Sequence, residues 1–256
     1  MENTISLPIT TWLYDLTTNQ PIININANLQ RHIASLSKIM TAMVVLDSNI
    51  DLTLSVKLIG AKLQPWTENQ NTLIVGEYYT IHELLIALLL PSNNAAATTL
   101  AEDYAGGYCK FVESMNTKAQ LLGMADTKFV DPTGADHGNM STAKDIHMML
   151  IETKNYPVLQ DISIMDSYNL TRNATVLSLR NMLNYHRHKI LDINFAKTAK
   201  DKEAKQGIGM LFGVDSLSKN QYTAVVLGEA DTPTLRISLE KMKKLIHIRR
   251  EKQNYT

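Results

Sequence analysis

A shortage of cysteine is the first constraint that this sequence sets. Cys109 is the only cysteine in 256 residues, so neither a disulfide within the chain nor a cysteine-rich metal cluster can form. An excess of charge of one sign is also missing, because 25 basic and 25 acidic residues give a formal net charge of zero at pH 7. A balanced surface offers no electrostatic reason to bind nucleic acid, and we expect no nucleic-acid partner.

Long apolar runs are absent as well. The longest strongly apolar run, Leu84–Leu90, is far shorter than the ~20 residues that span a bilayer. The opening segment, MENTISLPITTW, has neither the basic nor the apolar region of a secretory signal peptide. We therefore expect no membrane anchor in this chain. A periplasmic or other extracytoplasmic location is expected if a leader was removed before Met1, and a virion-associated or non-exported protein otherwise.

Internal repeats and linkers rich in Gly, Ser or Pro are also missing, which predicts one domain over residues 1–256. Apolar periodicity predicts strands near both ends of the chain, at residues 11–26, 206–214 and 221–228, and a closing helix at 235–248. Helices are predicted after Ser35, after Thr80, over 94–104 and 109–123, and after Thr142, where Thr80 and Thr142 are followed by acidic residues at capping spacing.

This order of elements predicts an α+β fold. Strands from the two ends of a chain pair most simply in one antiparallel sheet, and a mainly helical middle region would pack against it. We expect that helical subdomain at residues 50–160, roughly.

The stretch RHIASLSKIMTAM raises the question of chemistry. It places Ser35 three residues before Lys38, and on a helix such residues share a face. A serine hydroxyl needs an adjacent base, and a lysine serves as one when burial keeps it neutral. In the alternative interpretation, Ser35 or Ser37 merely caps the helix and Lys38 is solvated, because S-x-x-K is a common pattern.

Two further segments favour the chemical interpretation. Ser92–Asn94 reads S-N-N at a break between two predicted helices, and Lys197–Ala199 reads K-T-A before the C-terminal hairpin. A second hydroxyl and an amide can relay a proton and hold a substrate amide, and a second cation can hold a carboxylate. The order S-x-x-K, S-x-N, K-T-small is the one found in penicillin-binding proteins and class A β-lactamases.

On these segments the chain resembles the serine-type D-alanyl-D-alanine carboxypeptidases, the low-molecular-weight penicillin-binding proteins. The resemblance extends over residues 10–246 and includes ASLSKIMTAMVVLD, VGEYYTIHELLIALLLPSNNAAATTLAE, FVESMNTKAQLLGMADTKFVDPTG, and AVVLGEAD followed by Arg236. It implies a DD-peptidase or β-lactamase-like fold and a cell-wall hydrolase without a cofactor or a metal ion. We expect no additional C-terminal β-domain of the kind that many members carry.

The resemblance also implies a role for each residue of the motifs. Ser35 would attack the penultimate D-Ala carbonyl and Lys38 would take its proton. The other implied roles are a proton relay at Ser92, substrate amide binding at Asn94, binding of the terminal carboxylate by Lys197, Thr198 and Arg236, and an oxyanion hole from the backbone N–H groups of Ser35 and Lys200. The implied partners are peptidoglycan stem peptides that end in D-Ala-D-Ala, and β-lactam antibiotics, which would acylate the serine.

Two departures from the family pattern affect the K-T-A segment. Ala199 stands where the family has glycine, and Ala204-Lys205 stands where the family has Ala-Gly. Glycine at the first position lets a substrate backbone approach the strand closely, so we expect reduced binding from the Ala199 methyl group. A catalytically weak or inactive relative that binds peptidoglycan or has a structural role, for example in a phage particle, is the alternative that these departures leave open.

Two other functions find little support. A class A-like β-lactamase needs a glutamate base after S-x-N, and none occurs between Glu113 and Glu152, where Asp131 in FVDPTG matches the peptidase pattern instead. A metal site is not indicated, because His137, His147 and the pair at 186 and 188 show no H-E-x-x-H or comparable spacing. We expect these histidines to lie at the surface or in hydrogen bonds.

Overall fold

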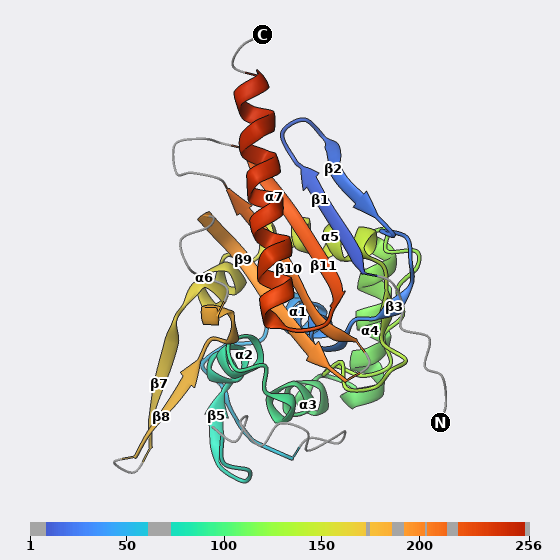
Figure 1. The fold of residues 1–256 in the computed structure, drawn as a ribbon. Coiled ribbons are helices and arrows are strands. Elements are labelled where there is room, and N and C mark those ends of the chain that lie inside the picture. The colour runs from blue at the N-terminus through green and yellow to red at the C-terminus, as the bar shows by residue number, and fades with distance from the viewer. Residues whose placement is uncertain are drawn as a thin grey trace, which may run out of the picture.

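The computed structural model describes residues 9–60, 73–172, 175–185, 192–202, 204–213 and 220–253. Its centre is an antiparallel sheet with the order β2-β1-β11-β10-β9 (Figure 1). The strands are β1 (Thr10–Asp15), β2 (Gln20–Ile25), β9 (Asp192–Asp201), β10 (Lys205–Gly213) and β11 (Gln221–Glu229). Strand β1 pairs with β11, from Thr10 opposite Leu227 to Asp15 opposite Tyr222. Strands from the two ends of the chain therefore share one sheet, as the sequence predicted.

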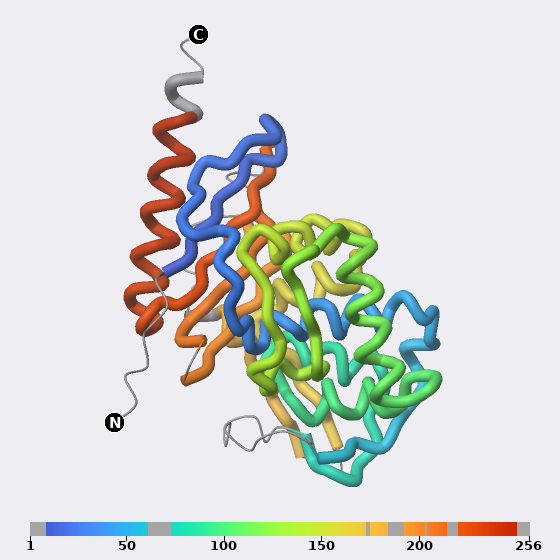
Figure 2. Tube along the Cα trace, turned by 90° about the vertical axis from the view of Figure 1, so that its right-hand side faces the viewer, coloured from blue at the N-terminus to red at the C-terminus, as the bar shows by residue number. Residues whose placement is uncertain are grey.

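Helices cover both faces of this sheet. They are α1 (Ser37–Asp47), α2 (Ile81–Leu89), α3 (Asn94–Asp103), α4 (Gly107–Leu121), α5 (Ala143–Glu152), α6 (Pro157–Ile164) and α7 (Thr232–Gln253). Figure 2 shows three layers: α7, the sheet, and the helices of the middle of the chain. Three two-stranded pairs lie outside the main sheet: β3 (Arg31–His32) with β6 (Met140–Ser141), β4 (Ser55–Lys57) with β5 (Tyr78–Thr80), and β7 (Ser167–Arg172) with β8 (Thr175–Arg180). The described residues also form the 3₁₀ turns η1 (Ala34–Leu36), η3 (Thr153–Asn155) and η4 (Met182–Tyr185).

The alternation of side chains along the strands separates two apolar cores. On β11, Val225 belongs to the larger core under α1–α6, whereas Val226 belongs to the smaller core under α7. Successive side chains of a strand point to opposite faces, so one apolar strand serves both cores. Helix α7 closes the smaller core with four buried side chains, Leu235, Leu239, Met242 and Ile246.

The predicted helix starts are confirmed at two threonines. Thr80 forms a complete capping box with Glu83, and Thr142 accepts a hydrogen bond from the backbone N–H of Asp145. Helix α2 ends at Leu89, just before Pro91. Helix α6 and the β7–β8 pair were not predicted, because both are short and carry weak periodicity.

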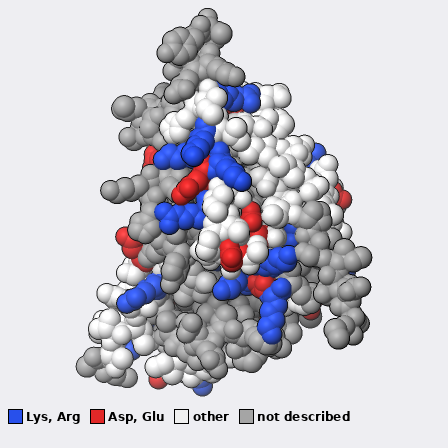
Figure 3. Space-filling model, viewed as in Figure 1, with Lys and Arg blue, Asp and Glu red and all other residues white. Residues whose placement is uncertain are grey.

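The outer face of α7 carries charged side chains together with three exposed apolar ones, Ile237, Leu245 and Ile248. Basic and acidic side chains alternate over this side of the molecule (Figure 3). Its four buried apolar side chains pack on β10 and β11, so α7 acts as the closing helix of the fold. Within the part of the chain that is described, no helix is both long enough and apolar enough to cross a bilayer. The single-domain extent over 1–256 stays a prediction.

Candidate active site

Ser35 lies in η1, the turn that joins β3 to α1. The sequence predicted that Ser35 opens the α-helix, but the helix begins at Ser37. Neither η1 nor α1 has a side-chain cap at its start, and Ser37 donates its hydroxyl to the carbonyl of Ala34 at 2.8 Å. Ser35 Oγ instead lies 3.2 Å from Lys38 Nζ. The interpretation of Ser35 as a helix cap is therefore wrong.

Lys38 is fully buried, with 0% of its surface exposed. Its Nζ contacts three oxygen atoms: Ser35 Oγ at 3.2 Å, Asn94 Oδ1 at 2.7 Å and the carbonyl of Thr133 at 2.6 Å. Burial lowers the pKa of Lys38 to about 7, although the negative charge of Asp131 acts in the opposite direction. A solvated lysine is thereby excluded.

The three contacts at Nζ suit either protonation state of Lys38: an ammonium would donate to all three oxygens, and a neutral amine would pair differently. A neutral lysine has two N–H groups and one lone pair. Asn94 Oδ1 and the Thr133 carbonyl can only accept, so they take the two N–H groups. The remaining lone pair then faces the hydroxyl of Ser35, which can donate its proton to it. This arrangement has the geometry of a nucleophile with its base.

Residues of the S-N-N and K-T-A segments contact each other on the other side of this site. Lys197 on β9 is 1% exposed, and its Nζ donates to Ser92 Oγ at 3.0 Å and to the Thr198 carbonyl at 3.0 Å. Burial lowers the pKa of Lys197 well below its usual value, and the charge of Lys38 lowers it further. Ser92 has φ of +63°, a left-handed conformation that is costly outside glycine and is common at functional sites.

Asn93, the middle residue of S-x-N, acts as the cap of α3. Its Oδ1 accepts the backbone N–H of Ala96 at 2.8 Å. The cap fixes the first residue of the helix, Asn94, whose side chain reaches Lys38. The S-x-N motif thus contributes one hydroxyl to Lys197 and one amide to Lys38.

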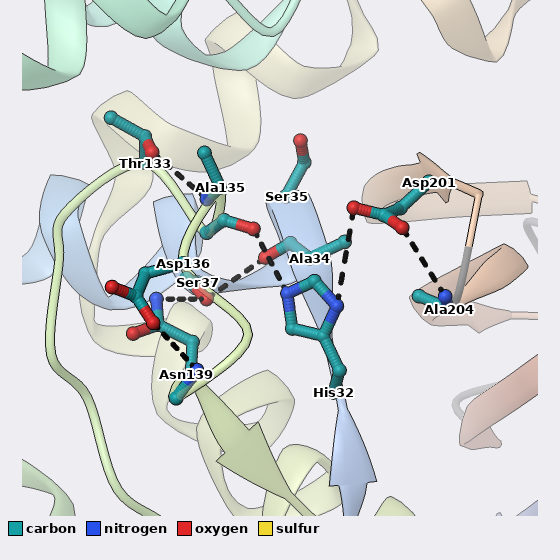
Figure 4. Close-up of polar contacts among 12 residues, drawn as sticks. His32, Ala34, Ser35, Ser37, Thr133, Ala135, Asp136, Asn139, Asp201 and Ala204 are labelled. Atoms are coloured by element: carbon teal, nitrogen blue, oxygen red, sulfur yellow. Dashed lines mark hydrogen bonds and ion pairs between the residues drawn. The ribbon is translucent and has the colours of Figure 1, made fainter. Parts of the chain in front are cut away.

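The loop at residues 131–139 supports Lys38, and residue spacing alone did not predict this contact. Asp131 accepts the backbone N–H groups of Thr133, Gly134 and Asp136 at 2.6, 3.0 and 2.9 Å, and this turn presents the Thr133 carbonyl to Lys38. Figure 4 shows this loop beside η1. A carbonyl group is common to every residue, so its role leaves no side-chain signal. Only the segment FVDPTG in the family resemblance pointed here.

Gly134 fixes how closely this loop approaches η1. Its φ is +80°, and a Cβ atom at this position would lie 1.9 Å from the carbonyl oxygen of Ala34. Asn139 joins the same two elements by donating to Ser37 Oγ at 2.9 Å and to the Asp131 carbonyl at 2.8 Å. The loop therefore holds the turn that carries Ser35 in place, and only glycine at position 134 allows the two to approach so closely.

Asp131 is not placed to act as the second base of a β-lactamase. Its carboxylate already accepts three backbone N–H groups and the hydroxyl of Thr133. A carboxylate held in this way has its lone pairs directed into the loop, away from a water molecule beside Ser35. The structure thus gives Asp131 a supporting role.

The structure places both departures of the K-T-A segment from the family pattern, Ala199 and Lys205. Ala199 is 4% exposed and belongs to the larger apolar core, on the same face of β9 as Lys197. From this face Lys197 reaches Ser92, so the expectation that the Ala199 methyl group reduces substrate binding stays a prediction. Lys205, where the family has glycine, adopts a φ of +60°. The turn keeps the backbone conformation that suits glycine although the side chain is a lysine.

Arg236 lies apart from the hydrogen-bonded group. It belongs to the first turns of α7, its side chain is 47% exposed, and its Nε contacts Glu240 Oε1 at 3.3 Å. Among the described residues, its contacts give no link to Ser35, Lys38 or Lys197. Lys200, the other predicted partner of the oxyanion, is paired with Gln206 near the end of β9, and its side chain is exposed.

Comparisons with known proteins agree with this geometry. A profile of the D-alanyl-D-alanine carboxypeptidase family matches residues 9–231. A D-alanyl-D-alanine endopeptidase of Escherichia coli is 39% identical over 151 residues, which cover 59% of this chain and 49% of that protein. A D-alanyl-D-alanine endopeptidase of Pseudomonas aeruginosa is 32% identical over 233 residues, which cover 88% of this chain and 75% of that protein.

Solved structures give the same fold. A Streptomyces DD-transpeptidase superimposes with a TM-score of 0.78 at 24% sequence identity, over 92% of this chain and 94% of that chain. The predicted α+β fold with a sheet from both ends of the chain is confirmed, and so is the predicted serine-peptidase class. This chain belongs to the D-alanyl-D-alanine carboxypeptidase family of serine peptidases, whose fold is that of the penicillin-binding proteins.

Proposed function

We propose that this protein is a serine DD-peptidase that cleaves peptidoglycan peptides through an acyl-enzyme on Ser35. The single observation that carries the proposal is the surroundings of Lys38. This buried amine has a pKa of about 7 and contacts the hydroxyl of Ser35 and two acceptors. A general base with a pKa near the working pH is the most effective one, which is what the burial of Lys38 supplies.

Acylation begins with the transfer of the Ser35 proton to the lone pair of Lys38. The Ser35 oxygen attacks the carbonyl carbon of the penultimate D-Ala, and the carbonyl oxygen becomes an oxyanion. The backbone N–H groups of Ser35 and Lys200 are proposed to bind that oxyanion, where one well-placed donor contributes about 3 kcal/mol. The positive ends of both N–H dipoles would stabilise the charge that forms in the transition state.

The leaving group then needs a proton. Ser92 is proposed to donate its hydroxyl proton to the departing D-Ala nitrogen, and Lys197, 3.0 Å away, stabilises the Ser92 oxygen as that proton leaves. Ser92 regains the proton from Lys38, so the transfer is balanced. Lys197 and Thr198 are proposed to bind the terminal carboxylate, and Asn94 the substrate amide, while the contribution of Arg236 stays a prediction.

Strand β9 is the edge strand of the sheet, and this position suits a peptide substrate. The N–H and C=O groups on its outer side are available to an extended backbone, which can bind by adding a further strand. Water would then attack the ester on Ser35 while Lys38 accepts a proton from that water, and Lys38 would return this proton to Ser35 Oγ as the ester bond breaks. The products are the free enzyme and a shortened peptide.

Two substrates fit this chemistry: a stem peptide that ends in D-Ala-D-Ala and a cross-link between two stem peptides. The E. coli and P. aeruginosa relatives are named endopeptidases. The cross-link is therefore the first substrate to test. Because peptidoglycan lies outside the cytoplasmic membrane, we infer an extracytoplasmic place of action, by export or by delivery from a virion.

A β-lactam tests the proposal directly, because it is a strained analogue of acyl-D-Ala-D-Ala whose leaving group stays tethered. Incubation with benzylpenicillin should add one drug mass to the intact chain, and digestion should place that mass on the peptide that contains Ser35. Ser35→Ala should lose the adduct. Ser37→Ala is the matched control, since this neighbouring hydroxyl bonds to Ala34 and should not be acylated. Release of D-Ala or cleavage of a cross-linked dimer would identify the substrate.

Three outcomes would contradict the proposal. Rapid turnover of penicillin without a trapped adduct would support a β-lactamase. An adduct that persists in Ser35→Ala would place the nucleophile elsewhere. Absence of an adduct together with absence of peptide cleavage would support an inactive, peptidoglycan-binding relative, for which the departures at Ala199 and Lys205 are the structural reason.

A further inference from the structure

A second group of reactive side chains lies beside Ser35, at the edge of the sheet. It consists of His32 on β3, Asp201 at the end of β9, and His137 in the loop before β6. One ligand atom from each of these residues can be chosen so that all three lie within 4.8 Å of one another. Figure 4 shows the ring of His32 between Asp201 and the loop that carries Thr133 and Asp136. None of these three residues belongs to the motifs of the peptidase site.

The ring of His32 is oriented for ligation. Its Nε2 lies 3.1 Å from the carbonyl of Gly134, and a carbonyl can only accept, so Nε2 carries the hydrogen. In the neutral ring, Nδ1 then presents a lone pair toward Asp201. Donation of the second ring N–H to a backbone carbonyl is the usual support for a histidine that binds a metal ion, because it fixes both the tautomer and the ring plane.

The two oxygen atoms of the Asp201 carboxylate also differ in their contacts. Its Oδ1 accepts the backbone N–H of Ala204 at 3.4 Å, while its Oδ2 lies 4.0 Å from His32 Nδ1 (Figure 4). That separation is too long for a hydrogen bond. Two ligands of a tetrahedral zinc ion lie about 3.3 Å apart, given metal-ligand distances near 2.0–2.1 Å. A shift of well under 1 Å would therefore bring both atoms onto one ion.

His137 completes the group from the solvent side. Its ring lies 4.9 Å from that of His32, between centroids, with the planes tilted by 46°. His32 is 8% exposed and Asp201 is 20% exposed, whereas His137 is exposed. The site thus has two ligands set into the protein and one at its entrance, so an ion could enter without unfolding the chain.

We propose that His32, His137 and Asp201 form a binding site for a divalent transition metal of the zinc class. Two imidazoles and one carboxylate are the donor set that zinc, and ions such as Co²⁺ and Ni²⁺, prefer. Calcium and magnesium prefer a shell of oxygen ligands, so they fit this set poorly. Three protein ligands leave the fourth position of a tetrahedral ion to water.

The location of the site connects it to the peptidase centre. His32 precedes Ser35 by three residues, and Asp201 follows Lys200 directly. A bound ion would tie the end of β9 to the segment that leads into η1. Sequence spacing could not indicate the site, since its members lie far apart in the chain. His137 lies at the surface, as the sequence predicted, and the proposal adds a ligand role to that position.

Metal binding to the untagged full-length protein, freed of metal with a chelator, is the direct test. Titration calorimetry with Zn²⁺ should show one site per chain, and Co²⁺ should give the visible absorption bands of a tetrahedral ion. Asp201→Asn and His137→Ala should each weaken Zn²⁺ binding about tenfold or more, because each removes one ligand. At the same Zn²⁺ concentration, the melting temperature should rise more for the wild type than for Asp201→Asn, because tighter binding to the folded state gives a larger stabilisation.

Controls separate this site from other metal-binding side chains. His247→Ala removes an exposed histidine on α7, and Cys109→Ser removes the exposed thiol, and neither should affect binding. Loss of binding only on substitution of the histidines at 186 and 188 would overturn the proposal, as would unchanged affinity in Asp201→Asn and His137→Ala. Absence of saturable Zn²⁺ binding to the wild type would overturn it as well. None of these readouts depends on peptidase activity.

Discussion

At the scale of single residues, the function of this site depends on how completely Lys38 is removed from water. Lysine normally stays protonated up to a pKa near 10.4, and a protonated amine cannot accept a proton from serine. Burial lowers the pKa of Lys38 to about 7, and hydrogen bonds to Asn94 and Thr133 hold its side chain in place. In the proposed mechanism, a lysine buried in the first turn of α1 therefore serves as the base.

The pH dependence of acylation follows from this pKa. Below pH 7 Lys38 is protonated, so the rate of acylation by a β-lactam should fall as the pH drops, and it should reach a plateau above pH 8. Lys38→Ala and Lys38→Arg should both lose at least about 100-fold in rate, since neither provides a neutral amine. Lys110→Ala, at an exposed lysine, should keep the wild-type profile. A rate that rises toward acid pH would remove Lys38 as the base.

Ala199→Gly tests the one departure inside the K-T-A segment. The Ala199 methyl is buried in the larger core, so its removal should cost about 1–2 kcal/mol of stability through lost burial and the freedom of glycine in a strand. The acylation rate constant, measured well below the melting temperature, should stay within about threefold of the wild type. Ala196→Gly, on the opposite face of β9, is the matched control. A rate increase confined to Ala199→Gly would show that the methyl obstructs the substrate.

The sequence predicted the six side chains of the three motifs, but their supporting contacts lay beyond its reach. Motif order and spacing predict which hydroxyls and amines come together. They carry no information on the Thr133 carbonyl or on the tautomer of His32, because both depend on how a loop folds. The face of β9 on which Ala199 lies was out of reach for a related reason, since a strand register has to be known before a face can be assigned.

At the scale of elements, the loop at 131–139 sets the position of η1, and Gly134 is its closest point of contact. Gly134→Ala should destabilise the fold by about 3 kcal/mol, from the left-handed backbone and the clash with the carbonyl of Ala34. Gly123→Ala is the matched control, because its φ is +75° and its Cβ would meet nothing within 4 Å, so it should cost only about 1 kcal/mol. Equal melting temperatures of the two variants would show that the loop yields easily.

The predicted elements succeeded where a local signal was strong. Capping residues identified α2 and α5, and alternation identified β1, β2, β10 and β11. The start of α1 was displaced by two residues because η1 is a 3₁₀ turn, and this tighter turn has no sequence signature that separates it from the first turn of a helix. That difference matters for function, since it places Ser35 ahead of the helix instead of inside it.

At the scale of the whole molecule, the sheet lies between the candidate active site on one face and the closing helix α7 on the other. Ser35, Lys38 and Ser92 belong to the helical side, Lys197 reaches them from the edge strand, and α7 covers the opposite face (Figure 2). The two apolar cores share the strands of the sheet but meet different helices. Damage to the core under α7 should therefore lower stability without changing the geometry around Ser35.

Two leucine variants of equal chemistry test this separation. Leu36→Ala lies between Ser35 and Ser37 in the larger core, and Leu239→Ala lies on α7 in the smaller core, at 0% and 3% exposure. Both should cost about 2–5 kcal/mol of unfolding free energy, as buried leucines do. At a temperature where both variants are folded, Leu239→Ala should acylate at the wild-type rate, whereas Leu36→Ala should acylate at least about tenfold more slowly because η1 loses its support. A large loss of acylation rate in Leu239→Ala, with folding intact by circular dichroism, would show that the sheet transmits the packing of α7 to the active site.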